Sequence, residues 1–132
     1  MKKLTLAATF AVLATGAFAD PVDGSWKTQP GDDGSYLHVS IAPCGSAICG
    51  TIDNAFDTNG DEVLNYVYQG RQIIWDMIPE GDGVYNNGKI WAPDRDKTYN
   101  SKMTLSGQNK LTVKGCVAGG LVCRGQDWSR IQ

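Results

Sequence analysis

The chain has 132 residues, with 12 Lys plus Arg, 14 Asp plus Glu and a formal net charge of −2. This length fits one domain and excludes a transmembrane bundle, a repeat array or a second domain for a cofactor. The mildly acidic balance gives no electrostatic basis for binding nucleic acid or an anionic membrane surface.

The first predicted element is a secretory signal peptide over residues 1–19. Lys2 and Lys3 precede an apolar stretch that ends at the small-residue cleavage site Ala17-Phe18-Ala19. The stretch is short and rich in alanine for a membrane span, so we expect cleavage rather than the alternative, a retained anchor. Cleavage after Ala19 removes 19 of the 132 residues, including two lysines, and leaves a domain of 113 residues (20–132) with a net charge of −4. We therefore expect a bacterial protein located in the periplasm or secreted, and not an integral membrane protein.

Short alternating apolar runs separated by turn residues dominate residues 20–132 and predict strands. The predicted strands are Gly24–Thr28, Ser35–Ala42, Ala47–Asp53, Arg71–Ile78, Val84–Trp91, Thr98–Leu105, Lys110–Val117 and Leu121–Ile131. Most of the links have hairpin length and carry Gly, Pro, Asp or Asn, which suit tight turns. The pattern predicts an all-β fold, an eight-stranded antiparallel up-and-down barrel, with a sandwich as the alternative.

One link is longer than the others, between Phe56 and Gly70. We expect a short helix or an irregular lid here, because long loops in compact domains are often functional. A solvated loop without a role is the alternative.

The four cysteines are predicted to form the disulfides Cys44–Cys49 and Cys116–Cys123. Strand alternation places both members of each pair on the outer face, on either side of one hairpin turn. Closing loops this short stabilises the fold by about 2–2.5 kcal/mol each in the chain-entropy model. Their spacing, with a single histidine in the chain, does not suit a zinc site.

Barrel closure is predicted from two short motifs, Gly24-Ser25-Trp26 near the start and Trp128-Ser129-Arg130 near the end. The first and last strands of a closed barrel are neighbours. We expect Arg130 to lie over the indole of Trp26 in a cation–π contact, with Gly24 allowing close approach of another segment.

With these motifs in view, the chain resembles the exported bacterial proteins grouped as domain of unknown function 2147, and more broadly the lipocalin and calycin barrels. The matching positions are Gly24 and Trp26, Cys49-Gly50, Gly70, Ile73-Ile74-Trp75-Asp76-Met77, Gly88-Lys89-Ile90, Pro93, Lys97-Thr98-Tyr99, Leu111-Thr112-Val113-Lys114-Gly115-Cys116, Trp128 and Arg130. The segment Asp57–Gln69 departs from the family pattern. The resemblance implies an exported lipocalin-like barrel and no established reaction.

Catalytic and metal sites are not predicted. His38 is the only imidazole, and it shares a face with Ser40 without the acid partner that a triad needs. The run from Asp57 to Glu62 lacks the glycine and carboxylate positions of an EF-hand. We therefore expect a protein that is not an enzyme and that has no cofactor.

The remaining candidate site is the barrel interior. Alternation places Ile73, Trp75 and Met77 on one face of the fourth strand, and Tyr99 and Met103 on one face of the sixth. An eight-stranded barrel either fills its interior or holds one small ligand. We expect these five residues to bind a small apolar or amphipathic molecule. The alternative is an envelope protein-interaction module, an inhibitor or assembly factor, that acts through its loops and has a packed interior.

Overall fold

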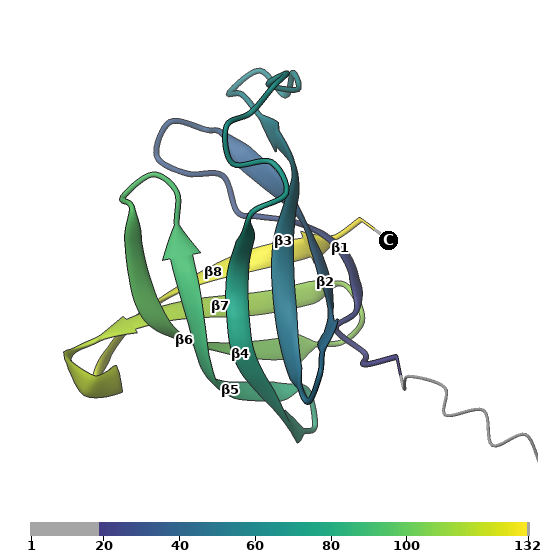
Figure 1. The fold of residues 1–132 in the computed structure, drawn as a ribbon, viewed down its shortest axis with the longest axis vertical. Helices are drawn as coiled ribbons and strands as arrows, with labels where there is room; N and C mark the ends of the chain where they lie inside the picture. The colour runs from purple at the N-terminus through teal and green to yellow at the C-terminus, as the bar shows by residue number, and fades with distance from the viewer. Residues whose placement is uncertain (1–18, 132) are drawn as a thin grey trace, which may run out of the picture.

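The computed structural model describes residues 19–131, in which eight antiparallel strands close into one barrel in sequence order. The predicted signal peptide lies almost entirely outside the described residues. The elements are β1 (Gly24–Lys27), β2 (Tyr36–Cys44), β3 (Ala47–Phe56), β4 (Gln72–Gly81), β5 (Val84–Ala92), β6 (Lys97–Ser106), β7 (Lys110–Val117), the 3-10 turn η1 (Ala118–Gly120) and β8 (Val122–Arg130). The predicted up-and-down barrel is confirmed (Figure 1).

Because every connection joins neighbouring strands, the links alternate between the two ends of the barrel. The short turns β2–β3, β4–β5 and β6–β7 lie at one end, which we call the closed end (Figure 1). The loops β1–β2, β3–β4, β5–β6 and β7–β8 surround the other end, which we call the open end.

The barrel closes where β8 pairs with β1, with Trp26 opposite Arg130 and Lys27 opposite Ser129. The Arg130 guanidinium carbon lies 4.4 Å from the centroid of the Trp26 ring. Gly24 has a φ of 135°, a region that L side chains rarely adopt, so a residue without Cβ suits this position.

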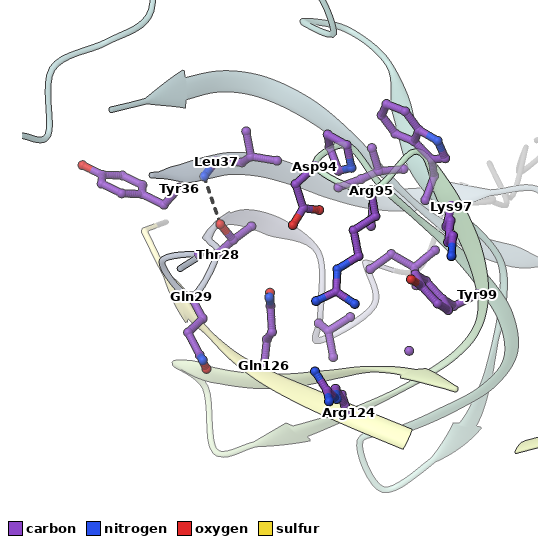
Figure 2. Close-up of a pocket in the computed structure, with 18 of the residues that line it drawn as sticks. Thr28, Gln29, Tyr36, Leu37, Asp94, Arg95, Lys97, Tyr99, Arg124 and Gln126 are labelled. Carbon is purple, nitrogen blue, oxygen red and sulfur yellow. Dashed lines mark hydrogen bonds between the residues drawn. The ribbon is translucent and has the colours of Figure 1, made fainter. Parts of the chain in front are cut away.

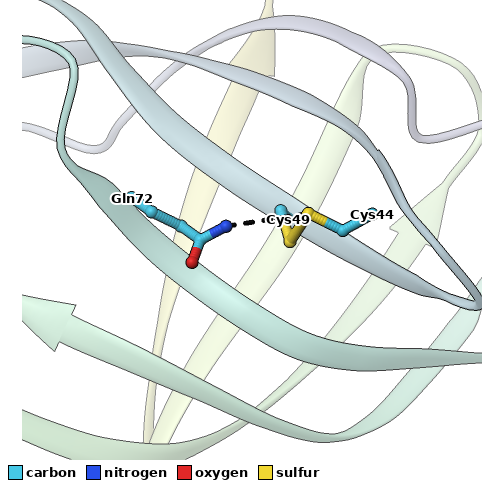
Figure 3. The surroundings of a disulfide bond; sticks show 3 residues. All are labelled: Cys44, Cys49 and Gln72. Carbon is cyan, nitrogen blue, oxygen red and sulfur yellow. Dashed lines mark hydrogen bonds between the residues drawn. A yellow bond between two sulfur atoms is a disulfide. The ribbon is translucent and has the colours of Figure 1, made fainter.

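Both disulfides have the pairing predicted from strand alternation. Cys44–Cys49 staples the β2–β3 hairpin at the closed end, with the Gln72 side-chain nitrogen 3.6 Å from the Cys44 sulfur (Figure 3). Cys116–Cys123 staples the β7–β8 hairpin at the open end, where the two residues are direct cross-strand partners.

The fourth strand departs from the predicted alternation. Asp76 has a φ of 55°, and Asn87 on the neighbouring strand has a φ of 62°; regular strand pairing is interrupted between these positions. Ile74 and Met77 are both buried, although strict alternation would place residues three positions apart on opposite faces of the strand. Of the three residues expected to share one face, Ile73 and Met77 are buried, whereas Trp75 is only partly buried, so strict alternation does not hold along this strand.

The β3–β4 loop contains no helix between residues 57 and 71. Of the two expectations, a short helix or an irregular segment, the structure shows the irregular segment. Backbone bonds anchor both of its ends to β3, from Val63 N to Ala55 O (2.9 Å) and from Gly70 N to Ile52 O (2.8 Å). Tyr66 and Tyr68 pack against the core, which holds the loop beside the open end.

Candidate functional site

A cavity of about 880 Å³ occupies the open end of the barrel. Four elements supply most of its walls: the β1–β2 loop, the β5–β6 turn, β7 and β8. The lining residues are Thr28, Gln29, Gly31, Asp32, Asp33, Ser35, Tyr36, Leu37, Tyr66, Ile73, Ile90, Trp91, Ala92, Pro93, Asp94, Arg95, Lys97, Tyr99, Val113, Gly115, Val117, Val122, Arg124, Gln126 and Trp128. This volume lies within the range of about 300–1,000 Å³ that is usual for small-molecule sites.

The inner part of the cavity is apolar. Ile90, Val113 and Trp128 contribute aliphatic and aromatic surface from three different strands. Gly115 leaves room opposite the aromatic ring of Tyr99: a Cβ there would lie 3.5 Å from the Tyr99 Cβ. A glycine at this strand position therefore contributes directly to the volume of the cavity.

Large side chains fill the barrel below the cavity. Trp26, Met77, Met103 and Leu111 are 0–1% exposed, and none of them lines the cavity. Gly88 leaves room for Met77, because a Cβ at Gly88 would lie only 2.7 Å from the Met77 sulfur. The interior is thus filled at the closed end and hollow at the open end.

One side of the cavity carries positively charged and polar groups. Arg124 and Gln126 project from β8, whereas Arg95 and Lys97 belong to the β5–β6 turn and the start of β6. Figure 2 shows Arg95 reaching from the rim toward the side on which Arg124 and Tyr99 lie.

Carboxylates lie on another part of the rim. Figure 2 shows Asp94 on the side of Leu37 and Thr28, where the Thr28 hydroxyl accepts a hydrogen bond from Leu37 N (2.9 Å). Asp33 accepts hydrogen bonds from the hydroxyl (2.6 Å) and backbone N (2.9 Å) of Ser35. These bonds hold the pKa of the Asp33 carboxyl below its usual value.

An aromatic and cationic cluster fixes the β3–β4 loop against the rim. The Arg71 guanidinium carbon lies 3.3 Å from the centroid of the Trp91 ring. Tyr68 meets the same ring edge-on at 4.9 Å, and the Trp91 indole donates to the Asp96 carboxylate (2.9 Å). Sequence reasoning missed this cluster, because its members come from a loop, a strand and a turn that no local pattern connects.

The five residues predicted to bind a ligand fall in three places. Ile73 and Tyr99 line the cavity. Met77 and Met103 lie in the filled part of the barrel, at 0% and 1% exposure. Trp75 is the cross-strand partner of Lys89, whose ammonium bonds the Asn100 side chain on the outer surface, so Trp75 faces outward. The cavity residues that sequence reasoning missed are chiefly the polar ones, Arg95, Lys97, Arg124 and Gln126.

Of the residues predicted to close the barrel, Trp26 and Arg130 meet at the closed end, whereas Trp128 has another position. Trp26 lies at the closed end, where its indole donates to Val22 O (2.9 Å). Arg130 donates there to Asp23 O (2.7 Å), Pro21 O (2.6 Å) and Gln108 O (2.5 Å). Arg130 therefore ties the N-terminal segment and the β6–β7 turn to the last strand. Trp128 lies opposite Leu111 across β7 and β8 and contributes to the inner wall of the cavity, while it is only 2% exposed.

His38 packs against an aromatic ring and not against Ser40. Its ring lies 4.3 Å from that of Phe56, and the Ser40 hydroxyl donates to Asp53 rather than to the imidazole. Burial, and then the charge of Lys27, lower the pKa of His38.

Across residues 19–131, no group of three or more His, Cys, Asp or Glu side chains is arranged to hold a metal ion. The Asp57 carboxylate accepts backbone bonds from Asn59 (2.9 Å) and Asp61 (3.0 Å), which makes it a turn-forming residue. Within the same residues, no helix is long and apolar enough to cross a membrane.

Comparison with known proteins agrees with this architecture. A family model described as an uncharacterized protein conserved in bacteria, domain of unknown function 2147, matches residues 24–130. No curated protein matches the chain. Among solved structures, protein HP1028 from the human pathogen Helicobacter pylori, described as belonging to the lipocalin family, has a similar fold. It aligns with a TM-score of 0.67 and 17% identity over 83% of this chain and 82% of that one.

Proposed function

The chain belongs to the bacterial family of domain of unknown function 2147, and from its half-hollow barrel we propose that it binds a small amphipathic molecule without transforming it. The observation that carries this proposal is the cavity of about 880 Å³ at the open end, with its apolar inner walls and polar rim. Ligand sites have this construction, in which apolar surface supplies affinity and a few polar groups supply orientation.

An exported location supports the same proposal. Two disulfides and no free cysteine occur among the described residues. Disulfides persist in the periplasm and outside the cell, and are rare in the reducing cytosol. We propose that cleavage after Ala19 produces the mature, functional protein, so the experiments below use residues 20–132.

The test is titration of this chain with dodecan-1-ol, followed by intrinsic tryptophan fluorescence, to which Trp91 and Trp128 in the cavity wall contribute. We expect saturable binding at one site. Gly115→Leu should abolish it, because the new side chain would project toward Tyr99 and Ile90, which lie 3.5 and 3.7 Å from a Cβ at this position.

Gly125→Leu is the matched control, because a Cβ at Gly125 meets Thr112 (3.4 Å) and Lys114 (3.5 Å) instead of the cavity residues. This variant should bind like the wild type. Binding that is equal in Gly115→Leu and the wild type would remove the cavity as the site.

A second function is favoured by one observation on the β3–β4 loop. Leu64 and Val67 are 77% and 79% exposed, and large apolar side chains gathered on a loop tip often mark an interaction site. Under this alternative the loop binds a protein of the envelope. Replacing Leu64 and Val67 together by Ser would then abolish binding to that partner and leave dodecan-1-ol binding unchanged.

A further inference from the structure

The positive side chains of the cavity form no ion pair in the described part of the chain, although Asp32, Asp33 and Asp94 also line the cavity. In the part of the chain that the structure describes, the one ion pair joins Lys110 and Asp127, on the outside of the barrel. Arg95, Lys97 and Arg124 line the cavity without a carboxylate bonded to any of them. Two of these groups are guanidiniums, which match the paired oxygens of a carboxylate or phosphate.

We infer that the ligand of this cavity carries an anionic head, a carboxylate or a phosphate, that is held by Arg95 and Arg124. This inference rests on the proposed ligand-binding function. The two side chains approach the same region from different elements, Arg95 from the β5–β6 turn and Arg124 from β8 (Figure 2). An anion between them removes the mutual repulsion of two like charges and gains charge-assisted hydrogen bonds.

The carboxylates of the rim orient the ligand. Asp94 lies on the Leu37 side of the cavity in Figure 2, away from Arg124. Asp32 and Asp33 belong to the β1–β2 loop on the rim. The Ser35 hydroxyl donates a hydrogen bond to one carboxylate oxygen of Asp33. Repulsion from these carboxylates directs an anionic head toward Arg95, Lys97 and Arg124.

The apolar inner wall then receives the remainder of the molecule. Ile90, Val113 and Trp128 lie deeper than the charged groups, around the space that Gly115 leaves open. A ligand with a charged head and a hydrocarbon tail meets both surfaces at once. A wholly apolar ligand would leave the guanidiniums without a partner, although these groups also remain in contact with water.

The experiment compares three probes of equal chain length: dodecanoate, dodecyl phosphate and dodecan-1-ol. Isothermal titration of residues 20–132 at pH 8 should show the two anions binding at least about tenfold more tightly than the alcohol, as expected for hydrogen bonds between charged groups. Arg95→Gln and Arg124→Gln should each reduce this preference. Lys102→Gln, which removes one positive charge on the exposed face of β6, should retain it.

The outcomes separate the inference from the proposed function. Equal affinity for all three probes, or a preference unchanged in both Arg variants, would overturn the anionic head and leave the binding function standing. Failure of every probe to bind would overturn both. A preference between dodecanoate and dodecyl phosphate identifies the head within the inferred class.

A second inference, which rests on the proposed cleavage after Ala19, concerns the N-terminal segment at the closed end. The Asp23 carboxylate has one buried oxygen, Oδ1, without a hydrogen-bond partner among the described residues. Its other oxygen accepts from the backbone N of Asp20 at 3.0 Å. Burial raises the pKa of this carboxyl above its usual value.

We propose that signal-peptide removal completes this end of the barrel by converting the Asp20 backbone N–H into an ammonium group beside Asp23. The peptide nitrogen supplies one donor, whereas the free terminus supplies three donors and a positive charge at the same place. Val22 and Arg130 already hold the segment: Val22 is fully buried, and Arg130 donates to the carbonyls of Pro21 and Asp23.

The test compares a chain that begins at Asp20 with one that retains Ala19, both in the wild-type sequence and with Asp23→Asn. The Asp20 chain should melt several degrees higher near neutral pH. This difference should disappear in the Asp23→Asn pair, and above about pH 8 as the α-amino group loses its proton. Equal melting temperatures of the two wild-type chains, or a difference that persists with Asp23→Asn, would overturn the proposal.

Discussion

The closed and open ends of this barrel are made by the same strands but differ in what fills them. At the closed end, Trp26, Met77, Met103 and Leu111 leave no room for a ligand. Strand β7 shows this difference, because it places Leu111 at the closed end and Gly115 at the open end. The interior of an eight-stranded barrel is close to the size at which side chains alone fill it. Small changes in side-chain volume along one strand therefore decide whether that end is packed or hollow.

This difference separates stability from binding. Truncating a buried side chain costs transfer free energy and leaves a cavity, whereas truncating a side chain at an existing cavity costs less. Substitutions at the closed end should therefore lower stability, and substitutions at the open end should change binding. The following predictions test this division.

The largest effect is expected for Trp26→Ala. This side chain is fully buried, donates to Val22 O and lies beneath Arg130, so its loss should lower the free energy of unfolding by about 3–5 kcal/mol. Tyr99→Ala, at the wall of the cavity, should cost less. Urea denaturation measures both, and equal losses would contradict the division between the two ends.

Two arginines on β8 offer a matched pair. Arg130→Ala should lower the free energy of unfolding by about 1–3 kcal/mol, because it removes the contact with Trp26 and the bonds to three carbonyls. Arg124→Ala, at the cavity, should cost less and weaken binding of dodecanoate. Thermal melts decide the first point, and an Arg130→Ala melt equal to that of the wild type would show that this contact does not secure barrel closure.

Two glycines test the packing directly. Gly88→Ala should destabilise the protein by about 1–3 kcal/mol, because its Cβ would lie 2.6 Å from the Met77 terminal methyl and 3.1 Å from the Met77 Cα. Gly115→Ala should be close to neutral, since its nearest neighbour is an ordinary contact at 3.5 Å. Chemical denaturation measures the free energy of unfolding of both variants. An unchanged value for Gly88→Ala would contradict the tight contact with Met77.

The smallest effect concerns Tyr85 at the closed end, whose hydroxyl donates to the Asp20 carboxylate. Burial and this bond raise the pKa of the phenol above its ordinary value. The bond's contribution, about 1 kcal/mol, is therefore complete below the unfolded pKa near 10 and is lost as the pH rises beyond it. The stability difference between wild type and Tyr85→Phe should shrink above pH 10; a difference that grows there would reverse the assigned direction.

Most of the fold could be predicted from local sequence patterns. Period-two alternation located all eight strands to within a few residues, since each strand buries one face and exposes the other. Alternation also placed Cys116 opposite Cys123 across a tight turn, because hairpin partners are close in sequence as well as in space. Closure between β1 and β8 followed from the strand count, because a closed sheet returns its last strand to its first.

Alternation failed at Asp76, because a non-glycine residue with positive φ leaves no regular signal in the chain. It also did not predict the association of Arg71 with Trp91, the position of Trp75 on the outer face or the boundary between the packed and hollow halves. These features depend on side chains brought together from distant strands and loops, whose combined volumes and charges exist only in the folded barrel. The sequence by itself thus determined the strands, their order and the disulfides, while the tertiary structure alone decided which end of the barrel is hollow and which charges face the cavity.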